Sequence, residues 1–211
     1  MGSSRLPGKV MLPIAGRPLL DHVVGRLASL RREIAVVVAT STELRDDVIA
    51  EHCIHAGVRC FRGSERDVLG RYVACARSEQ FDHVVRLTAD NPFTDMEELD
   101  RLIEKHLREG NDYTHSFGAM PVGVGAEIFM REALERSARE GHAANHREHV
   151  NEYIQENPGV FRIGQLDVPS AKRRPDLSLT VDTDADYERA CRIAQTAAGR
   201  WISTTEAIAA C

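Results

Sequence analysis

Short apolar runs alternate with longer amphipathic stretches along most of the chain. Residues 34–39 form a continuous apolar run, Ile-Ala-Val-Val-Val-Ala, which is typical of a strand covered on both faces. Further strands are expected at 58–61, 83–88, 112–115 and 178–181, and helices from about residue 17 and at about 41–55, 66–78, 96–108, 131–139, 147–156 and 185–198. This alternation predicts an α/β fold with a doubly wound, mostly parallel sheet.

Composition and charge favour a single-domain globular protein and argue against nucleic-acid-binding and membrane proteins. With 211 residues, 43% of them hydrophobic, the chain can form a single domain over residues 1–211 with a sizeable core. A formal net charge of −5 argues against a surface that coats nucleic acid. The five cysteines form no Cys-x-x-Cys pair, the sequence has no long apolar span, and its polar first residues do not predict a targeting segment. We therefore expect a reduced, cytoplasmic protein that binds neither nucleic acid nor membrane.

Two aspartates directly follow predicted strands. Asp90 ends Leu-Thr-Ala-Asp, and Asp182 ends Leu-Thr-Val-Asp, so both belong to the sheet edge where such folds bind ligands. Two carboxylates about 4 Å apart repel by roughly 4 kcal/mol at an effective dielectric near 20, and Mg²⁺ between them would remove that repulsion. Each aspartate could instead cap the following helix. Asp95 and Asp184 lie closer to the helix starts and fit that role better.

The opening segment Gly-Ser-Ser-Arg-Leu-Pro-Gly-Lys supplies the opposite charge. Gly2 and Gly8 permit close backbone approach to an anion. The Arg5 guanidinium and the Lys9 ammonium suit phosphate oxygens. The spacing matches neither the G-x-x-x-x-G-K-[ST] phosphate loop nor the G-x-G-x-x-G dinucleotide motif. The segment alone thus indicates an anion site, with a disordered N-terminus as the alternative.

A third polar cluster lies at residues 147–149, within a predicted helix. Arg147 and His149 could contact a carboxylate or phosphate of a substrate, or form part of a solvated helix face. His142 and His146 share the helical spacing of His149, but no cysteine or acidic pattern completes a zinc site.

Five segments, in this order, resemble the spore-coat-polysaccharide type of cytidylyltransferase, which is related to the acylneuraminate and 3-deoxy-manno-octulosonate cytidylyltransferases. They are residues 2–10, 61–71, 86–92, 147–154 and 179–183. The resemblance runs from Met1 to about Arg192. It implies a Rossmann-like fold of the nucleotide-diphospho-sugar transferase type. It also implies transfer of CMP from CTP to an acidic sugar or a phosphorylated or phosphonate acceptor, with release of pyrophosphate.

The resemblance also implies roles for individual residues. Asp90 and Asp182 would bind Mg²⁺, while Arg5 and Lys9 would stabilise the departing pyrophosphate, so these four are the expected catalytic residues. The expected nucleotide-binding residues are Gly2, Ser3, Ser4, Arg5, Lys9, Arg62, Ser64, Asp67, Arg71 and Arg86. The expected acceptor-binding residues are Glu127, Arg147 and His149. Relatives often pair through the segment between the late strands, which suggests a homodimer, but the sequence leaves the oligomeric state open.

The chain departs from the family pattern in three places. Thr88-Ala-Asp stands where relatives usually have Thr-Gly-Asp, and Ser178 stands where a basic or bulkier residue is common. The largest departure precedes Met1, where relatives have an apolar strand ending in Gln-Ala-Arg. Without that strand two sheet edges stay unpaired, at about 1–3 kcal/mol for each unsatisfied group. We therefore expect Met1 to be an internal methionine of a longer protein.

Two other functions remain open. Nucleotide-sugar glycosyltransferases and other NTP–sugar nucleotidyltransferases have the same fold, which cannot separate them from cytidylyltransferases. A chain that lacks a central strand could also be an inactive nucleotide-binding remnant. The sequence does not identify the acceptor.

Overall fold

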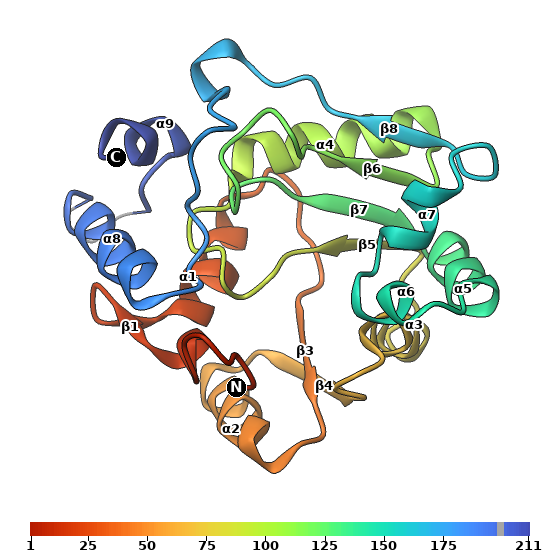
Figure 1. The fold of residues 1–211 in the computed structure, drawn as a ribbon, viewed down its shortest axis with the longest axis horizontal. Helices are drawn as coiled ribbons and strands as arrows, with labels where there is room; N and C mark the ends of the chain where they lie inside the picture. The colour runs from red at the N-terminus through yellow and green to blue at the C-terminus, as the bar shows by residue number, and fades with distance from the viewer. Residues whose placement is uncertain (198–200) are drawn as a thin grey trace.

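The strands form a middle layer that is flanked by helices (Figure 1). The computed structural model describes residues 1–197 and 201–211. The elements are η1 (Lys9–Met11), β1 (Pro13–Ile14), β2 (Arg17–Pro18), α1 (Leu19–Arg26), η2 (Leu27–Ser29), β3 (Val37–Ser41), η3 (Leu44–Asp46), α2 (Asp47–Ala56), β4 (Arg59–Gly63), α3 (Val68–Ser78), β5 (His83–Arg86), α4 (Met96–Glu109), β6 (Tyr113–His115), β7 (Glu127–Met130), α5 (Arg131–Glu140), α6 (Ala144–Glu148), α7 (Glu152–Glu156), β8 (Ile163–Gln165), η4 (Ser170–Lys172), α8 (Asp184–Gln195) and α9 (Thr204–Ala209). The predicted α/β class is confirmed.

The strands pair in three groups. β3 is parallel to β4, and β1 and β2 form a small antiparallel pair. The third group has the order β5-β7-β6-β8, in which β7 runs antiparallel to both neighbours and β6 runs parallel to β8. The order is not sequential because crossovers through helices separate the strands, as in other α/β folds.

Several predicted boundaries differ from the structure. The strand expected at 34–39 begins at Val37, because pairing with β4 starts at Val37 opposite Arg59. The strand expected at 178–181 is wrong: this extended segment makes a single bridge, between Val122 and Ser178. The helix expected at 147–156 is two short helices, α6 and α7. Position 198, the expected end of the last helix, lies outside the described residues.

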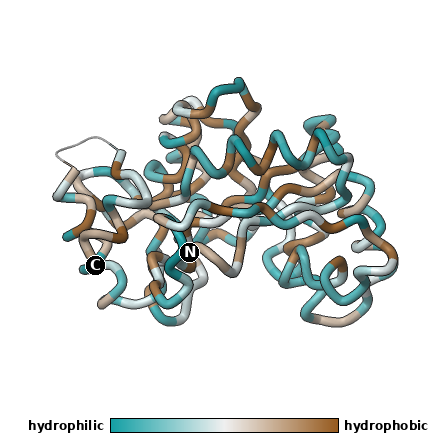
Figure 2. The backbone as a smooth tube through the Cα atoms, turned by 90° about the horizontal axis from the view of Figure 1, so that it is seen from above, coloured by the Kyte–Doolittle hydropathy of each residue, from teal (hydrophilic) through white to brown (hydrophobic). Residues whose placement is uncertain are grey.

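β7 is buried on both faces and divides the core into two clusters. Ile128 packs with Leu102 of α4 on one face, and Phe129 packs with Leu134 of α5 on the other. All four side chains are at most 2% exposed. The alternation of side chains along the strand sends neighbouring residues into opposite clusters. The hydrophobic segments accordingly run through the middle of the molecule in Figure 2.

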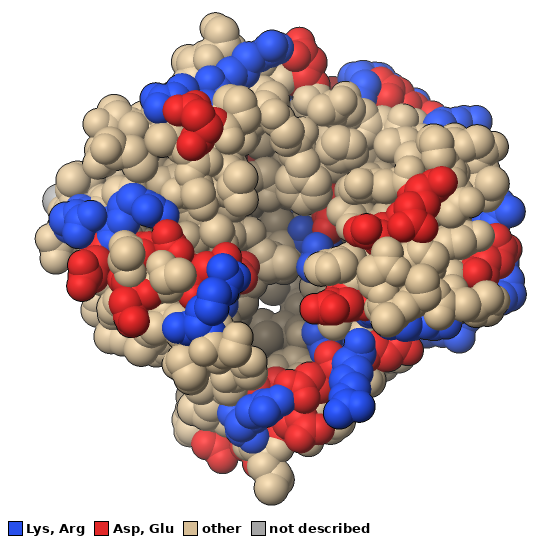
Figure 3. Space-filling model, in the orientation of Figure 1, with Lys and Arg blue, Asp and Glu red and all other residues tan. Residues whose placement is uncertain are grey.

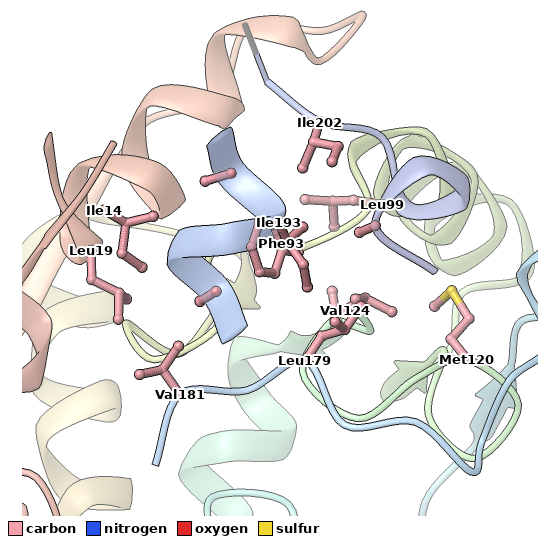
Figure 4. Packing of buried hydrophobic residues seen from close by; sticks show 14 of the residues in the cluster. Ile14, Leu19, Phe93, Leu99, Met120, Val124, Leu179, Val181, Ile193 and Ile202 are labelled. Carbon is pink, nitrogen blue, oxygen red and sulfur yellow. The ribbon is translucent and has the colours of Figure 1, made fainter. Parts of the chain in front are cut away.

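The larger cluster fixes the opening segment of the chain. Ile14 and Leu19 pack in the same cluster as Val181 and Ile193 of the last third of the chain, with Phe93 also in the cluster (Figure 4). Ile14 and Leu19 are 0% exposed, so the residues that follow the opening loop are anchored by apolar burial. Among the described residues, no helix combines the length and apolar character that a membrane crossing requires.

Helix α2 offers a direct test of this packing. Ile49 and Ile54 lie on the same helix but are 5% and 75% exposed. Substitution Ile49→Ala removes buried methyl groups from the cluster that also contains Leu20 and Cys53. We expect it to lower the free energy of unfolding by about 2–5 kcal/mol in urea denaturation.

The matched control is Ile54→Ala, for which we expect a change of less than about 0.5 kcal/mol. Equal effects of the two substitutions would show that α2 does not pack as described.

Candidate active site

A lysine lies between two aspartates at the carboxyl end of the sheet. Lys9 Nζ donates to Asp90 Oδ2 at 2.8 Å, to Asp182 Oδ1 at 2.7 Å and to the carbonyl oxygen of Val181 at 2.8 Å. The ammonium group has three donors, and each has an acceptor here. The Lys9 side chain is 11% exposed, and those of Asp90 and Asp182 are 29% and 28% exposed. The structure thus gathers the two acids around one shared cation.

Backbone contacts place these three side chains. Gly8 has φ 73° and precedes the turn η1 that begins with Lys9, and glycine adopts this left-handed conformation without strain. Asp90 follows β5, and its carbonyl oxygen accepts a hydrogen bond of 2.9 Å from the backbone N–H of Val181. This bond holds the two acidic segments side by side.

Arg5 adds a second positive charge. Its Nη2 lies 3.1 Å from Asp182 Oδ2, and its side chain is 63% exposed. An ion pair this exposed contributes little to stability, so the guanidinium is free to turn toward a ligand. Burial by itself lowers the pKa of Lys9, but the hydrogen bonds to Asp182 and Asp90 outweigh burial and raise it above its usual value. Lys9 is therefore charged at neutral pH.

Neither Asp90 nor Asp182 caps a helix among the described residues. Asp95 caps α4 by accepting a hydrogen bond from the N–H of Glu98 at 3.0 Å, as predicted. The cap of α8 is Thr183 rather than Asp184, and its hydroxyl oxygen accepts from the N–H of Asp186. The prediction for Asp184 is wrong by one position. The carboxylates of Asp90 and Asp182 are thus available for other partners.

The donor atoms of this cluster fit a magnesium ion. Two carboxylates and the Val181 carbonyl converge on one point, where the Lys9 ammonium now stands as a cation. These are hard oxygen ligands, and Mg²⁺ is usually held by one or two carboxylates together with substrate phosphates. Asp90 and Asp182 are therefore the residues that would hold the ion.

A second acidic group, at Asp95, Glu97 and Glu98, has ligand atoms within 4.8 Å of one another. Lys172 Nζ pairs with all three, at 2.8–2.9 Å. Two of these carboxylates have further partners, since Asp95 caps α4 and Glu98 pairs with Arg101. This cluster ties η4 to α4, and the side chains of Asp95 and Glu98 are 5% and 1% exposed, so we assign it a structural role.

The predicted motifs at 61–71 and 147–154 meet at the start of α3. Asp67 Oδ1 accepts the N–H of Gly70 at 2.8 Å and so caps the helix. Arg147 Nη1 lies 3.8 Å from Asp67 Oδ2, and Arg147 Nη2 donates to the carbonyl oxygen of Ala138. His149 is exposed. Together these residues form a charged surface next to the N-terminus of α3.

Two other predicted residues belong to the same surface. Ser64 accepts the N–H of Asp67 at 3.0 Å through its hydroxyl oxygen, and Arg71 Nη1 donates to the Ser64 carbonyl at 2.6 Å. The opening loop reaches this surface, because a Cβ at Gly2 would lie 3.0 Å from Glu65 Oε1. Ser4 is exposed in that loop, and Ser3 accepts the N–H of Leu6.

Three further predicted residues have hydrogen-bond or ion-pair partners within the protein. Arg62 donates to the carbonyl oxygens of Ser41 and Glu43 and so braces the turn after β3. Arg86 pairs with Glu127 at 2.5 Å. The expectation that Glu127 lines an acceptor surface is wrong, because its side chain is 0% exposed and its other oxygen accepts from the Tyr113 hydroxyl at 2.7 Å. Burying this carboxylate requires these partners.

Sequence reasoning missed two features of the site. The Val181 carbonyl is a backbone atom, which no pattern of residue types reveals. The bond from Lys9 to both aspartates was also not predicted, since the lysine was assigned to phosphate oxygens. The juxtaposition of two predicted strand ends with a cationic loop was the signal for such a contact.

The sequence model of the family described as Cytidylyltransferase matches residues 1–205. The chain therefore belongs to the cytidylyltransferase family, as its five motifs predicted.

Individual relatives agree with this family. Spore coat polysaccharide biosynthesis protein SpsF of Bacillus subtilis (strain 168) is 39% identical over 193 residues, which cover 89% of this chain and 80% of SpsF. A cytidylyltransferase structure from Leptospira borgpetersenii is 30% identical with a TM-score of 0.92, covering 99% of this chain and 89% of that one. A CMP:2-keto-3-deoxy-manno-octonic acid synthetase complexed with CTP has a TM-score of 0.70 at 18% identity, covering 93% of this chain and 94% of that one. This last likeness shows the Rossmann-like nucleotidyltransferase fold alone.

The Lys9 contact predicts how the protein responds to divalent cations without nucleotide. Substitution Lys9→Met leaves Asp90 and Asp182 without their shared cation, so we expect a loss of about 1–3 kcal/mol in the free energy of unfolding. Millimolar Mg²⁺ should restore much of this loss, because the ion can replace the ammonium. Urea denaturation with and without Mg²⁺ measures both effects.

The control is Lys105→Met, which removes a lysine from a surface pair with Glu109. If Mg²⁺ stabilises Lys9→Met no more than Lys105→Met, the two aspartates do not form a cation site.

Proposed function

We propose that the protein is a Mg²⁺-dependent cytidylyltransferase that transfers CMP from CTP to an acidic sugar or a phosphorylated or phosphonate acceptor. The observation that carries this proposal is the convergence of Asp90, Asp182 and Val181 on one cation, with Arg5 beside it. Such a site would neutralise the charge of a triphosphate and position it. Catalysis of phosphoryl transfer consists almost entirely of these two effects.

The reaction exchanges one bond at phosphorus for another. An acceptor oxygen attacks the α-phosphorus of CTP in line, and the bond from that phosphorus to the bridging oxygen breaks. Pyrophosphate leaves with the bridging oxygen. A hydroxyl of an acidic sugar that attacks loses its proton to solvent, whereas a phosphate or phosphonate oxygen attacks as the anion. A bound Mg²⁺ would supply positive charge at the reacting phosphate. The guanidinium of Arg5 would stabilise the negative charge that develops on the departing pyrophosphate.

Lys9 has two successive partners in this account. Its ammonium holds the carboxylates of Asp90 and Asp182 together in the described structure. Asp90 and Asp182 would hold a metal ion in place of the Lys9 ammonium, since two cations cannot share that position. The released side chain, on the first residue of η1, would then pair with the phosphates of the nucleotide.

The acceptor would bind beside the N-terminus of α3. Arg147 lies on α6 with its guanidinium 3.8 Å from Asp67, and the exposed His149 directly follows the same helix. Planar guanidinium groups suit carboxylate and phosphate recognition, which favours an anionic acceptor. SpsF, by its name, acts in spore coat polysaccharide biosynthesis, and we infer a comparable role in making surface polysaccharides in the cytoplasm. A homodimer stays a prediction.

The two aspartates predict the outcome of a direct assay. Substitutions Asp90→Asn and Asp182→Asn each remove one negative ligand at the point where Lys9 now lies. We expect each to lower pyrophosphate release from CTP by at least about 100-fold, the loss typical of removing a group that stabilises transition-state charge. A coupled pyrophosphate assay with a panel of acidic sugars and phosphorylated acceptors measures this rate.

The control is Asp184→Asn, an exposed neighbour of Asp182 on the first turn of α8, which should keep activity within about twofold.

The same assay tests the choice of nucleotide, and CTP should serve as donor in preference to GTP and UTP. Equal release from all three nucleotides, or unchanged rates in the Asn variants, would contradict the proposal.

A further inference from the structure

One peptide unit of the candidate active site has a partner at each end. The carbonyl oxygen of Val181 accepts a hydrogen bond from Lys9 Nζ at 2.8 Å, and the N–H of the same peptide, on Asp182, donates to Asp186 Oδ2 at 3.2 Å. The peptide is trans, so its C=O and N–H bonds lie in one plane and point in opposite directions. Asp186 therefore holds the end of the peptide that faces away from the shared cation.

Asp186 also fixes the peptide on the other side of Asp182. Its Oδ2 atom accepts the backbone N–H of Thr183 at 2.9 Å and the Thr183 hydroxyl at 2.8 Å, contacts that belong to the capping box of α8. The bond from the Asp182 N–H adds the residue before the cap to this ordinary arrangement. Both peptides that flank the Cα of Asp182 thus donate to one oxygen. This constrains the backbone dihedral angles of Asp182 and the direction in which its carboxylate projects.

The Asp186 carboxylate is itself held in place. Its Oδ1 atom accepts a hydrogen bond of 2.7 Å from Arg189 Nη2, one turn further along α8, and its side chain is 19% exposed. Ala190 and Ile193 of the same helix pack in the larger hydrophobic cluster. Charged side chains of both signs gather over α8, beside the central hollow of the face in Figure 3. The helix is therefore a fixed support for Asp186 at the edge of the site.

The negative charge of Asp186 acts through the peptide. A carboxylate at the N–H end polarises the peptide bond, which increases the negative charge on the Val181 carbonyl oxygen. Both oxygens of Asp186 already accept hydrogen bonds, from the turn and from Arg189, so Asp186 acts on the cation through the peptide. Groups that orient the ligands of a cation in this way typically affect its affinity strongly.

We propose that Asp186 is a positioning residue that aims the Val181 carbonyl and the Asp182 carboxylate at one cation. In the described structure this cation is the ammonium of Lys9. The extension to a bound metal ion rests on the proposed function, whereas the effect on Lys9 does not.

The capping box of α9 supplies a matched control within the same chain. Glu206 Oε2 accepts the N–H of Ser203 at 2.9 Å and the Ser203 hydroxyl at 2.7 Å, as Asp186 does for Thr183. Neither Ser203 nor Glu206 belongs to the Lys9 cluster. Substitutions Asp186→Ala and Glu206→Ala therefore each weaken a helix cap, but only Asp186→Ala releases the peptide between Val181 and Asp182.

The first measurement is the rate at which an amine-reactive ester labels Lys9, read by mass spectrometry without metal or nucleotide. Lys105, which pairs with Glu109 on α4, is the internal reference. We expect Asp186→Ala to raise Lys9 labelling relative to Lys105 at least about threefold, the change expected when one of three hydrogen bonds is weakened. Glu206→Ala should leave the ratio unchanged.

Two milder variants separate positioning from capping. Asp186→Glu keeps a carboxylate that can reach the cap, as Glu206 does at the equivalent position of α9, so it should restore slow labelling of Lys9. Arg189→Met leaves the contacts with Thr183 in place and releases the other oxygen of Asp186, so it should raise labelling in the same direction as Asp186→Ala.

The second measurement is the Mg²⁺ concentration that gives half-maximal pyrophosphate release from CTP with the acceptor panel described above. We expect Asp186→Ala to raise this concentration at least about tenfold, while the rate at saturating Mg²⁺ changes less than about threefold. Asp186→Glu and Glu206→Ala should both keep the Mg²⁺ requirement of the unsubstituted protein.

The two measurements distinguish this proposal from the proposed function. Equal Lys9 labelling in Asp186→Ala, Arg189→Met and Glu206→Ala would overturn the positioning role, as would an active Asp186→Ala protein with an unchanged Mg²⁺ requirement. Faster labelling in Asp186→Ala and Arg189→Met, with no pyrophosphate release by the unsubstituted protein, would support the positioning role and contradict the proposed function.

Discussion

The arrangement of the site depends on one contact, the ammonium of Lys9 between the carboxylates of Asp90 and Asp182. The lysine lies 81 residues before Asp90 and 173 before Asp182. Two carboxylates this close to one point repel each other unless a cation separates them. Three segments carry these side chains: the opening loop, the turn after β5 and the segment before α8. The hydrophobic cluster around Ile14, Phe93 and Val181 fixes their positions relative to one another.

Sequence reasoning located the acidic pair by placing Asp90 and Asp182 after two strands whose carboxyl ends would meet at one sheet edge. Only Asp90 follows a strand, β5, and the segment before Asp182 is held beside it by the hydrogen bond from the Val181 N–H to the Asp90 carbonyl. The sequence-based predictions failed where packing against distant segments determines the burial or pairing of a residue. Glu127 has the charge of a binding residue, yet the fold buries it against Arg86 and Tyr113. β7 was not predicted, because its four residues begin with that glutamate. Ser178 lies in a run of residues with high β propensity, but it forms a single isolated bridge, to Val122.

We propose that Asp90 and Asp182 hold one cation, which is Lys9 in the free protein and would be a metal ion in the nucleotide complex. Anomalous diffraction from crystals grown with CTP and Mn²⁺ tests it most directly. The account predicts an anomalous peak between the two carboxylates, with the Lys9 ammonium turned to the phosphates. A nucleotide-bound crystal in which Lys9 still bridges both aspartates, with manganese at Asp95 and Glu98 or nowhere in the protein, would contradict it.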